Sequence, residues 1–504
     1  MKKKRIIINY LFNLIYQVYV IIVPLITTPY VARILGPDGI GKYSFSQSRV
    51  NYFVLVAGFG FLTYGQREIA KHKDDIEKQS QVFWEIIISR GILVIFVSVV
   101  YLLFILAGAF GDYSDLMIAF SVNIIAVGFD ICFYFSGNEE FGRLALRNIV
   151  LKTVGVVCIF SFVKKKEDLV LYVIINTLII LVSNISLWFY ICKKIKIKKI
   201  SFNRVLLRFR EAIIFFIPAI ATTIYTIFDK TLIGIMTPGT EDIIIFENGK
   251  YLSETVKRCD LENGYYEQAE KIIKLALTII TSLSTVIYSR NSAENEKGNK
   301  NEVKNNLYFS ASLTWLLSLP MAFGAFSISS NLIPWFLGDG FQKSITLMRI
   351  LAPLPIFIGF ANVIGYQYLM ASNREKIYTI SVSIAAALNL IINLLLIPTL
   401  YSVGAAIGTI FAELSGPLIC IIYLKKEIDV KKIFALSVKP LVASVVMSVF
   451  TFYLSLSINP SIYNTSIIVL VSVIIYGVAL ALLRESFIVM AIDKIMKRLK
   501  HLLH

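Results

Sequence analysis

The sequence predicts an all-α protein that crosses a membrane about fourteen times. Hydrophobic residues make up 57% of its 504 residues, and the mean hydropathy is +0.72, well above that of a soluble domain. Apolar runs of about 20 residues recur along the chain, and each is long enough to cross a bilayer as a helix. The first run follows a basic N-terminus without a small-residue cleavage site, so we interpret it as a retained span and not a signal peptide.

The predicted spans are joined by mostly short connections. They cover residues 8–35, 41–65, 81–109, 115–137, 145–164, 168–192, 209–236, 268–289, 307–329, 345–371, 377–398, 402–424, 436–457 and 463–484. The long basic connection after the sixth span divides the first twelve into an N-terminal lobe (1–200) and a C-terminal lobe (201–430) of six helices each. Residues 431–504 add two helices and a tail, 491–504, whose mixed apolar and basic residues predict an amphipathic helix on the cytoplasmic surface.

The net charge of +17 follows the predicted topology. Lys and Arg gather at the N-terminus and in the connections after spans 2, 6 and 12, whereas the connections after spans 3, 11 and 13 have none. By the positive-inside rule both termini are predicted to be cytoplasmic, and nucleic acid is not needed to explain the basic charge. One basic cluster, residues 164–166, falls on the predicted outer side and conflicts with this pattern.

The residue types exclude several kinds of chemistry. The five cysteines are scattered without a Cys-x-x-Cys spacing, which predicts neither a disulfide framework nor a metal site. The chain has three histidines, two of them in the C-terminal tail, so histidine-based catalysis is not expected.

The stretch from residue 27 to residue 75 organises the N-terminal lobe. Gly36-Pro37-Asp38-Gly39 predicts a tight turn between the first two spans. The second span carries Gln47, Arg49 and Asn51 among aromatic residues. A related pattern recurs later, where Gly264-Tyr265-Tyr266-Glu267-Gln268 parallels the Gly41-Lys42-Tyr43 segment, and such internal repeats are typical of transporters with a site between the repeats.

Several charged residues lie within the predicted spans, where charge is costly unless it faces a wet cavity. The cations are Arg33, Arg49, Lys230 and Arg349, and the carboxylates are Asp130, Asp229 and Glu413. Two structural alternatives stay open. The cations would snorkel to the outer interface, or Asp229 and Lys230 would form an ion pair that only holds helices together.

Three further segments carry a family resemblance. They are Gly137-Asn138-Glu139-Glu140-Phe141 with Ala145-Leu146-Arg147-Asn148, Phe228-Asp229-Lys230, and residues 263–272, which read NGYYEQAEKI. Together with residues 27–75 they resemble the Wzx-type polysaccharide flippases of the multidrug/oligosaccharidyl-lipid/polysaccharide exporter superfamily. The chain departs from similar proteins at Tyr288-Ser289-Arg290, where they tend to have Leu-Pro-Arg, and in its longer, acidic outer loop 237–263.

The resemblance implies two six-helix lobes around a central cavity in the bacterial cytoplasmic membrane. It implies export of undecaprenyl-diphosphate-linked repeat units for capsule or O-antigen, with a polysaccharide polymerase and glycosyltransferases as partners. It implies no cofactor, apart from coupling to H+ or Na+.

The chemistry of this cargo assigns roles to the charged residues within the spans. A guanidinium fork suits a diphosphate, so Arg49 and Arg349 are the first candidates for binding it, followed by Arg33 and Lys230, with Gln47 and Asn51 nearby. Asp229, Glu413 and Asp130 are the candidates for ion coupling.

Other functions stay open at this point. A cation-coupled multidrug antiporter of the same superfamily would have an acidic cavity, and a peptidoglycan-precursor (lipid II) flippase would share the cargo's lipid diphosphate. A membrane glycosyltransferase or polymerase would use acidic residues such as those of loop 237–263, but this loop is short and has no nucleotide or metal motif. An enzyme is therefore not expected.

Overall fold

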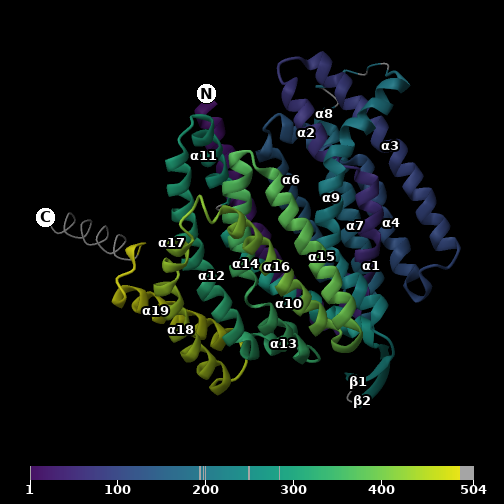
Figure 1. Cartoon of the computed structure of the whole chain (residues 1–504). Helices are drawn as coiled ribbons and strands as arrows, with labels where there is room; N and C mark the ends of the chain where they lie inside the picture. Colours follow the sequence, from purple (N-terminus) through teal and green to yellow (C-terminus); the bar gives the residue numbers. More distant parts are fainter. Residues whose placement is uncertain are drawn as a thin grey trace. The chain divides into compact units, whose positions relative to one another are not determined.

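The computed structural model describes residues 2–191, 194–196, 198, 200–247, 250–282 and 284–487, and most of them are helical (Figure 1). The predicted amphipathic tail, 491–504, lies outside the described residues. The chain divides into two compact units, Met1–Gly264 and Tyr265–His504. The lobe boundaries drawn from the sequence at residues 200 and 430 stay predictions.

The first unit contains most of the helices predicted for the N-terminal lobe and a pair of strands. Its elements are α1 (Lys2–Gly58), α2 (Phe61–Lys71), α3 (Ile76–Leu106), η1 (Gly111–Tyr113), α4 (Ser114–Phe129), α5 (Cys132–Gly137), α6 (Phe141–Phe162), η2 (Lys166–Asp168), α7 (Leu169–Ser186), α8 (Trp188–Ile191), α9 (Phe202–Met236), β1 (Thr240–Glu247), β2 (Lys250–Lys257) and the start of α10 (Arg258–Ser282). Within it, α1 packs against α4, α6 and α9, and α4 packs against α7.

The second unit is helical throughout its described part. It holds the rest of α10, α11 (Ser284–Glu296), α12 (Lys300–Leu337), α13 (Gln342–Leu351), α14 (Leu354–Phe360), the π-helix η3 (Ala361–Leu369), η4 (Met370–Ser372), α15 (Glu375–Leu400), α16 (Ser402–Leu424), α17 (Val430–Ala435), α18 (Val438–Ser457) and α19 (Ile462–Leu482). The pair α15 and α16 packs closely, as does α18 between α12 and α19.

The structure has eleven helical stretches long and apolar enough to cross a membrane, counted over the described residues. Exposed apolar side chains cover their outer faces, for example Ile95 at 67% and Leu470 at 63% exposure, as expected where lipid is the solvent. The predicted class, a polytopic all-α membrane protein, is confirmed. The number fourteen stays a prediction, since the eleven do not include α9, which contains the predicted span 209–236, or α10 and α11, over which the predicted span 268–289 extends.

The predicted break between the first two spans falls at Gly36, inside α1. Its backbone angles, φ +68° and ψ 173°, lie outside the helical region and suit glycine. Before Gly36, α1 runs along α6, because Tyr16 accepts a hydrogen bond from Asn148 near the start of α6 and Tyr30 donates to the carbonyl of Val163 just past its end.

After Gly36 the second part of α1 runs back along the same unit. Phe45 packs against Tyr113 of η1, and Phe53 packs against Tyr101 of α3, with ring centroids 5.2 and 4.9 Å apart. Further on, Phe59 packs against Phe209 of α9. The reversal therefore brings residues 36–49 to the end of the unit that carries η1, η2 and the strands.

The acidic loop predicted at 237–263 is largely a β-hairpin that leads directly into α10. β1 and β2 pair antiparallel, with Thr240 opposite Lys257 and Glu247 opposite Lys250. The sequence carried a signal for this hairpin, because Asn248-Gly249 between two β-rich runs is the dipeptide that favours a two-residue hairpin turn.

Candidate functional site

Charged side chains from five elements gather at the end of the first unit where α1 reverses. We call this group the outer cluster. Its members are Asp38, Lys42 and Arg49 of α1, Asp112 and Tyr113 of η1, Lys166 of η2, Glu254 and Lys257 of β2, and Asp260 of α10. Of these residues, the sequence analysis singled out Arg49 as a site residue.

Two glycines allow α1 and α10 to approach closely enough to form the outer cluster. A Cβ atom on Gly41 would lie 1.6 Å from the carbonyl oxygen of Asp260, and one on Gly264 would lie 1.9 Å from that of Pro37. Neither position has room for a larger residue, because the obstacle in each case is backbone. These are the glycines of the two repeated motifs, so this contact gives the repeat a packing role.

The Arg49 guanidinium is enclosed by aromatic rings. It lies 4.2 Å from the ring centroid of Phe45, 4.7 Å from that of Tyr113 and 5.4 Å from that of Phe110. Its Nε and Nη2 atoms are shielded from solvent and have no hydrogen-bond acceptor among the described residues. Rings attract a cation through their faces but do not accept hydrogen bonds from its N–H groups as an oxygen does, so these two nitrogens remain able to donate to an acceptor.

Asp260 is the carboxylate of the outer cluster that is most enclosed. It is 0% exposed, and its Oδ1 accepts a hydrogen bond of 2.8 Å from the Tyr113 hydroxyl. Burial raises the pKa of this carboxyl to about 6, against the lowering effects of the Tyr113 bond and of the Lys42 and Lys257 charges.

The basic cluster at 164–166 conflicted with the predicted charge pattern. The ion pairs of Lys166 explain how a basic residue is accommodated there. Its Nζ lies 3.0 Å from Asp38 Oδ2 and 2.6 Å from Glu254 Oε2. Two carboxylates therefore neutralise this ammonium at the predicted outer end, and Lys166 ties η2 to α1 and to the hairpin.

Most of the other predicted residues of the first unit lie on α1 and α9, which pack together. Gln47 donates to the Tyr43 hydroxyl (3.1 Å), and Asn51 is half-buried. On α9, Asp229 is buried and Lys230 half-buried, next to Thr231, which contacts both Tyr52 and Ser48 of α1. Arg33, just before the kink, is exposed. The structure thus brings Arg49, Gln47, Asn51, Asp229 and Lys230 onto neighbouring helices.

Arg349, in the second unit, has a different environment from that of Arg49. Its Nε donates to Ser329 Oγ (3.0 Å) and its Nη2 to Ser330 Oγ (2.5 Å), both on α12. The guanidinium lies 5.6 Å from the ring centroids of Phe326 and Phe452. Arg349 therefore joins α13 to α12 and α18, and its Nε and Nη2 atoms both donate hydrogen bonds.

Asp130 acts as a helix-terminal group, and Glu413 lies in the other unit. Asp130 ends α4, and its Oδ1 accepts the backbone N–H of Cys132 (2.8 Å) at the start of α5. Its backbone carbonyl accepts a hydrogen bond from Arg90, which is 2% exposed. Glu413 is half-buried in α16. These two carboxylates do not join the outer cluster.

A second charged network, which the sequence analysis missed, lies where α2, α3 and α9 meet. Glu85 is 0% exposed and its Oε2 accepts from Arg208 Nε (2.8 Å) and lies 2.7 Å from Nη2. Arg208 Nη1 also donates to the Tyr64 hydroxyl (2.5 Å) and to Glu211 (2.8 Å). The available signal was the interruption of the apolar run 81–109 by Glu85.

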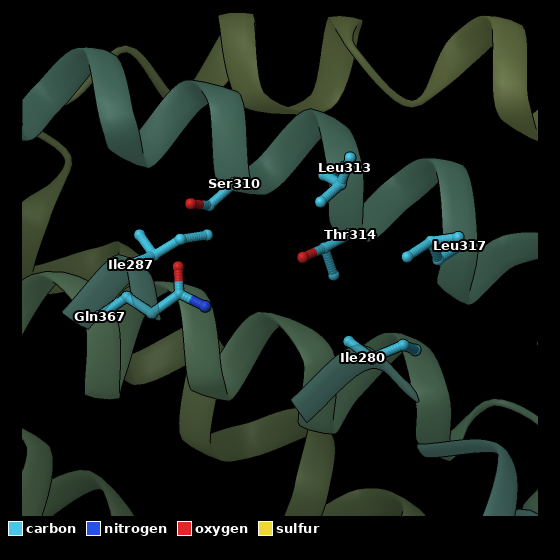
Figure 2. Close-up of a pocket in the computed structure, with 7 residues that line it drawn as sticks. All are labelled: Ile280, Ile287, Ser310, Leu313, Thr314, Leu317 and Gln367. Carbon is cyan, nitrogen blue, oxygen red and sulfur yellow. The ribbon is translucent and has the colours of Figure 1, made fainter. Parts of the chain in front are cut away.

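The second unit contains a buried network of neutral side chains around η3. Asn306 donates to Asn291 Oδ1 (2.9 Å), Asn291 to the carbonyl of Gln367 (2.8 Å), and Gln367 Nε2 to Ser284 Oγ (3.0 Å). Figure 2 shows the Gln367 amide oxygen beside a cavity of about 10 Å³, also lined by the hydroxyl residues Ser310 and Thr314. The cavity has room for about one water molecule.

A metal site does not emerge from the part of the chain that the structure describes, since no three His, Cys, Asp or Glu residues converge there as ligands.

Comparison with known proteins connects these features to a family. The family model described as "Polysaccharide biosynthesis protein" matches residues 6–293, more than half of the chain. The chain belongs to this polysaccharide biosynthesis family. The predicted resemblance is thereby confirmed, and the matched region, residues 6–293, contains every residue of the outer cluster. A second model, described as lipid II flippase MurJ, matches residues 263–474.

Curated relatives of this family member have related descriptions. It is 24% identical over 400 residues to a putative O-antigen transporter of Escherichia coli K12, covering 78% of this chain and 90% of the relative. It is 21% identical over 413 residues to a putative O-antigen transporter of Shigella dysenteriae, covering 80% and 95%. A probable low-salt glycan biosynthesis flippase, Agl15 of Haloferax volcanii, matches 168 residues at 24% identity, covering 33% and 35%.

Solved structures support the predicted architecture. Lipid II flippase MurJ in an inward closed conformation superposes with a TM-score of 0.72 at 15% identity, covering 95% of this chain and 100% of that one. An inward-facing multidrug resistance MATE family transporter of the MOP superfamily gives 0.58 at 14% identity, covering 85% and 95%. At these identities the likeness shows the fold alone.

Proposed function

We propose that this protein is a flippase that moves undecaprenyl-diphosphate-linked polysaccharide repeat units from the cytoplasmic to the outer leaflet. Membership of the polysaccharide biosynthesis family and the O-antigen transporter descriptions of its relatives support this cargo class. We place the protein in the bacterial cytoplasmic membrane with both termini in the cytoplasm, upstream of a polysaccharide polymerase and downstream of glycosyltransferases.

The observation that carries the proposal is the environment of Arg49. A cation inside a membrane protein needs a partner that compensates its charge, and aromatic rings supply only part of that compensation. Two buried nitrogen atoms, Nε and Nη2, which have no acceptor among the residues that the structure describes, match the oxygens of a diphosphate, which accept two such bonds at once. Arg33 and Lys230, both in the first unit, are the secondary candidates for guiding the head group.

The mechanism follows from the two ends of the cargo. The prenyl tail is stable in hydrocarbon, whereas the diphosphate and sugars are not, because unpaired charge and polar groups are costly there. Arg49 would bind the diphosphate, while amide side chains such as Gln47 and Asn51 would hydrogen-bond sugar hydroxyls. The tail would remain in lipid throughout. Asp229 and Glu413 are proposed as coupling groups for H+ or Na+.

The test is reconstitution of the full chain into vesicles with undecaprenyl-diphosphate-N-acetylglucosamine as probe. We expect transfer of the sugar to the opposite leaflet, measured by its accessibility to an added sugar-modifying enzyme. Vesicles with the Arg49→Ala protein should lose this transfer, and vesicles with the Ser466→Ala protein, altered at an exposed hydroxyl, should retain it. Equal transfer by Arg49→Ala and the unmodified protein would refute the head-group role of Arg49.

Lipid II flipping is the second candidate, because the MurJ family model matches residues 263–474. The same vesicles loaded with lipid II distinguish the two. Faster transfer of lipid II than of the single-sugar probe would favour this alternative.

A further inference from the structure

Asp260 is buried, and one of its carboxylate oxygens has no hydrogen-bond partner in the described part of the chain. The side chain is 0% exposed, and while Oδ1 is bound by Tyr113, Oδ2 has no hydrogen-bond partner among the described residues. The carboxylate also forms no salt bridge within that part of the chain. Such a group is under-compensated when ionised, so its negative charge is destabilised by its surroundings.

Charged groups face Asp260 from each neighbouring element. From α1, Lys42 favours the ionised carboxyl and Asp38 opposes it, and from β2 Lys257 favours it. The Lys42 and Lys257 ammonium groups are shared with other carboxylates, since Lys42 lies 4.0 Å from Asp38 and Lys257 lies 2.5 Å from Asp112 of η1. On its own helix, Cys259 Sγ lies 3.9 Å from Asp260 Oδ1.

The other charged residues of the outer cluster influence Asp260 indirectly, through the residues that surround it. Lys166 of η2 is paired with Asp38 and with Glu254 of β2. Arg49 of α1 is close enough for its charge to be influenced electrostatically by Asp260. The net effect of burial and of these charges is that the pKa of Asp260 is raised to about 6, with burial as the largest cause. Its carboxyl therefore changes protonation state near neutral pH.

Tyr113 joins this carboxyl to Arg49. Its hydroxyl donates to Asp260, while its ring lies 4.7 Å from the Arg49 guanidinium and 4.9 Å from the Lys257 ammonium. An anion bound by Arg49 would neutralise positive charge near Asp260 and favour its protonated form. By reciprocity, a proton on Asp260 removes the negative charge that competes for Arg49 and strengthens anion binding.

We propose that Asp260 is a proton-binding site whose occupancy is linked to binding of a diphosphate at Arg49, so that proton and head group bind together. The identity of the anion rests on the proposed function, whereas the proton site rests on the burial and partners of Asp260. The two parts are therefore tested separately.

The proton site is tested by infrared difference titration of the purified full-length protein between pH 4.5 and 7.5. We expect a carboxylic acid band that disappears with a midpoint near pH 6, as the pKa of Asp260 implies. The band should be absent from Asp260→Asn, shifted but present in Asp260→Glu, and unchanged in Asp115→Asn, which alters an exposed carboxylate in the first turn of α4. An unchanged band in a folded Asp260→Asn protein would overturn the assignment.

The linkage is tested with inorganic pyrophosphate as probe, by calorimetry at pH 5.5 and 7.5. The quantity compared is the pyrophosphate affinity of the unmodified protein divided by that of Asp260→Asn. We expect this ratio to rise about tenfold from pH 7.5 to pH 5.5. The ratio cancels the effect of pH on pyrophosphate itself, because both proteins bind the same probe. An unchanged ratio would overturn the linkage. If Arg49→Ala bound pyrophosphate like the unmodified protein, the proposed head-group site and the linkage would fail, while the infrared band would still decide the proton site.

Discussion

Arg49 and Arg349 were equal candidates in the sequence, and their surroundings in the structure differ. Both guanidinium groups lie against aromatic rings, at 4.2 Å for the nearest ring in one case and 5.6 Å in the other. Arg349 donates to two serine hydroxyls, whereas two nitrogen atoms of Arg49 have no acceptor among the described residues. We therefore expect Arg349 to contribute to the packing of its unit and Arg49 to have donors left for a ligand.

The difference shows that a cation within a span indicates a ligand site only when some of its hydrogen-bond donors have no partner in the protein. Arg208 extends the comparison, because its guanidinium is fully engaged with Glu85, Tyr64 and Glu211. Occupied donors predict that a substitution costs stability, and unoccupied donors predict that it costs ligand binding. The following four substitutions test that distinction, from the largest expected effect to the smallest.

Glu85→Ala should be the most damaging change, because it leaves the Arg208 guanidinium buried without its main counter-charge. Removing one partner of a buried ion pair costs about 3–5 kcal/mol. We expect a strongly lowered midpoint of thermal unfolding in detergent. Glu77→Ala removes a solvent-exposed carboxylate of the same helix, which pairs with Lys198, and should cost little. Equal stability of the two variants would contradict the structural role of the Glu85 network.

Arg49→Ala should reduce head-group affinity and transport by 30-fold or more, since truncating a charge that is hydrogen-bonded to a buried partner costs about 2–5 kcal/mol. Its unfolding midpoint should stay close to that of the unmodified protein. Arg49→Lys keeps the charge but loses the bidentate fork, so intermediate transport is expected. A loss of folded protein that accounts for the whole loss of transport would make Arg49 a packing residue like Arg349.

Arg349→Ala should show the opposite balance. Hydrogen bonds that involve a charged group contribute about 1.5–3 kcal/mol each, so this variant should unfold more easily. Transport per folded molecule should remain near that of the unmodified protein, measured in vesicles with matched protein content. Transport that falls as far as in Arg49→Ala, at normal stability, would restore Arg349 as a head-group ligand.

Ser329→Ala should have the smallest effect, about 1.5–3 kcal/mol, because it removes one of the two hydrogen bonds and Nη2 of Arg349 still reaches Ser330. Combined with Arg349→Ala, the loss should be less than additive, since both changes remove the same bond. A double-mutant cycle on thermal stability measures this. Additive losses would show that the Arg349–Ser329 bond does not contribute to stability.

The class of protein and its family could be predicted from the sequence, because apolar runs of span length and local motifs do not depend on distant contacts. The break at Gly36 was also predictable, since glycine adopts positive φ without strain. Arg49 could be singled out as a charge in an apolar run. The outer cluster could not be predicted, because the sequence pattern assigned Asp38 to a turn and Asp260 to an acidic loop.

Asp38 and Asp260 belong to one cluster only because Gly41 and Gly264 let the backbones of α1 and α10 approach closely. Their positions lie more than two hundred residues apart, so no local pattern indicates the contact. In the same way Lys166 conflicts with the topology in sequence and is neutralised in the fold by Asp38 and Glu254.

The sequence by itself determined that this chain is a multi-pass helical membrane protein of the polysaccharide biosynthesis family, because hydropathy and motif content are properties of short segments. Tertiary structure alone decided which buried charges are compensated. Compensation depends on partners supplied by other helices, and in the described part of the chain two donor atoms of Arg49 and one acceptor atom of Asp260 have no such partner.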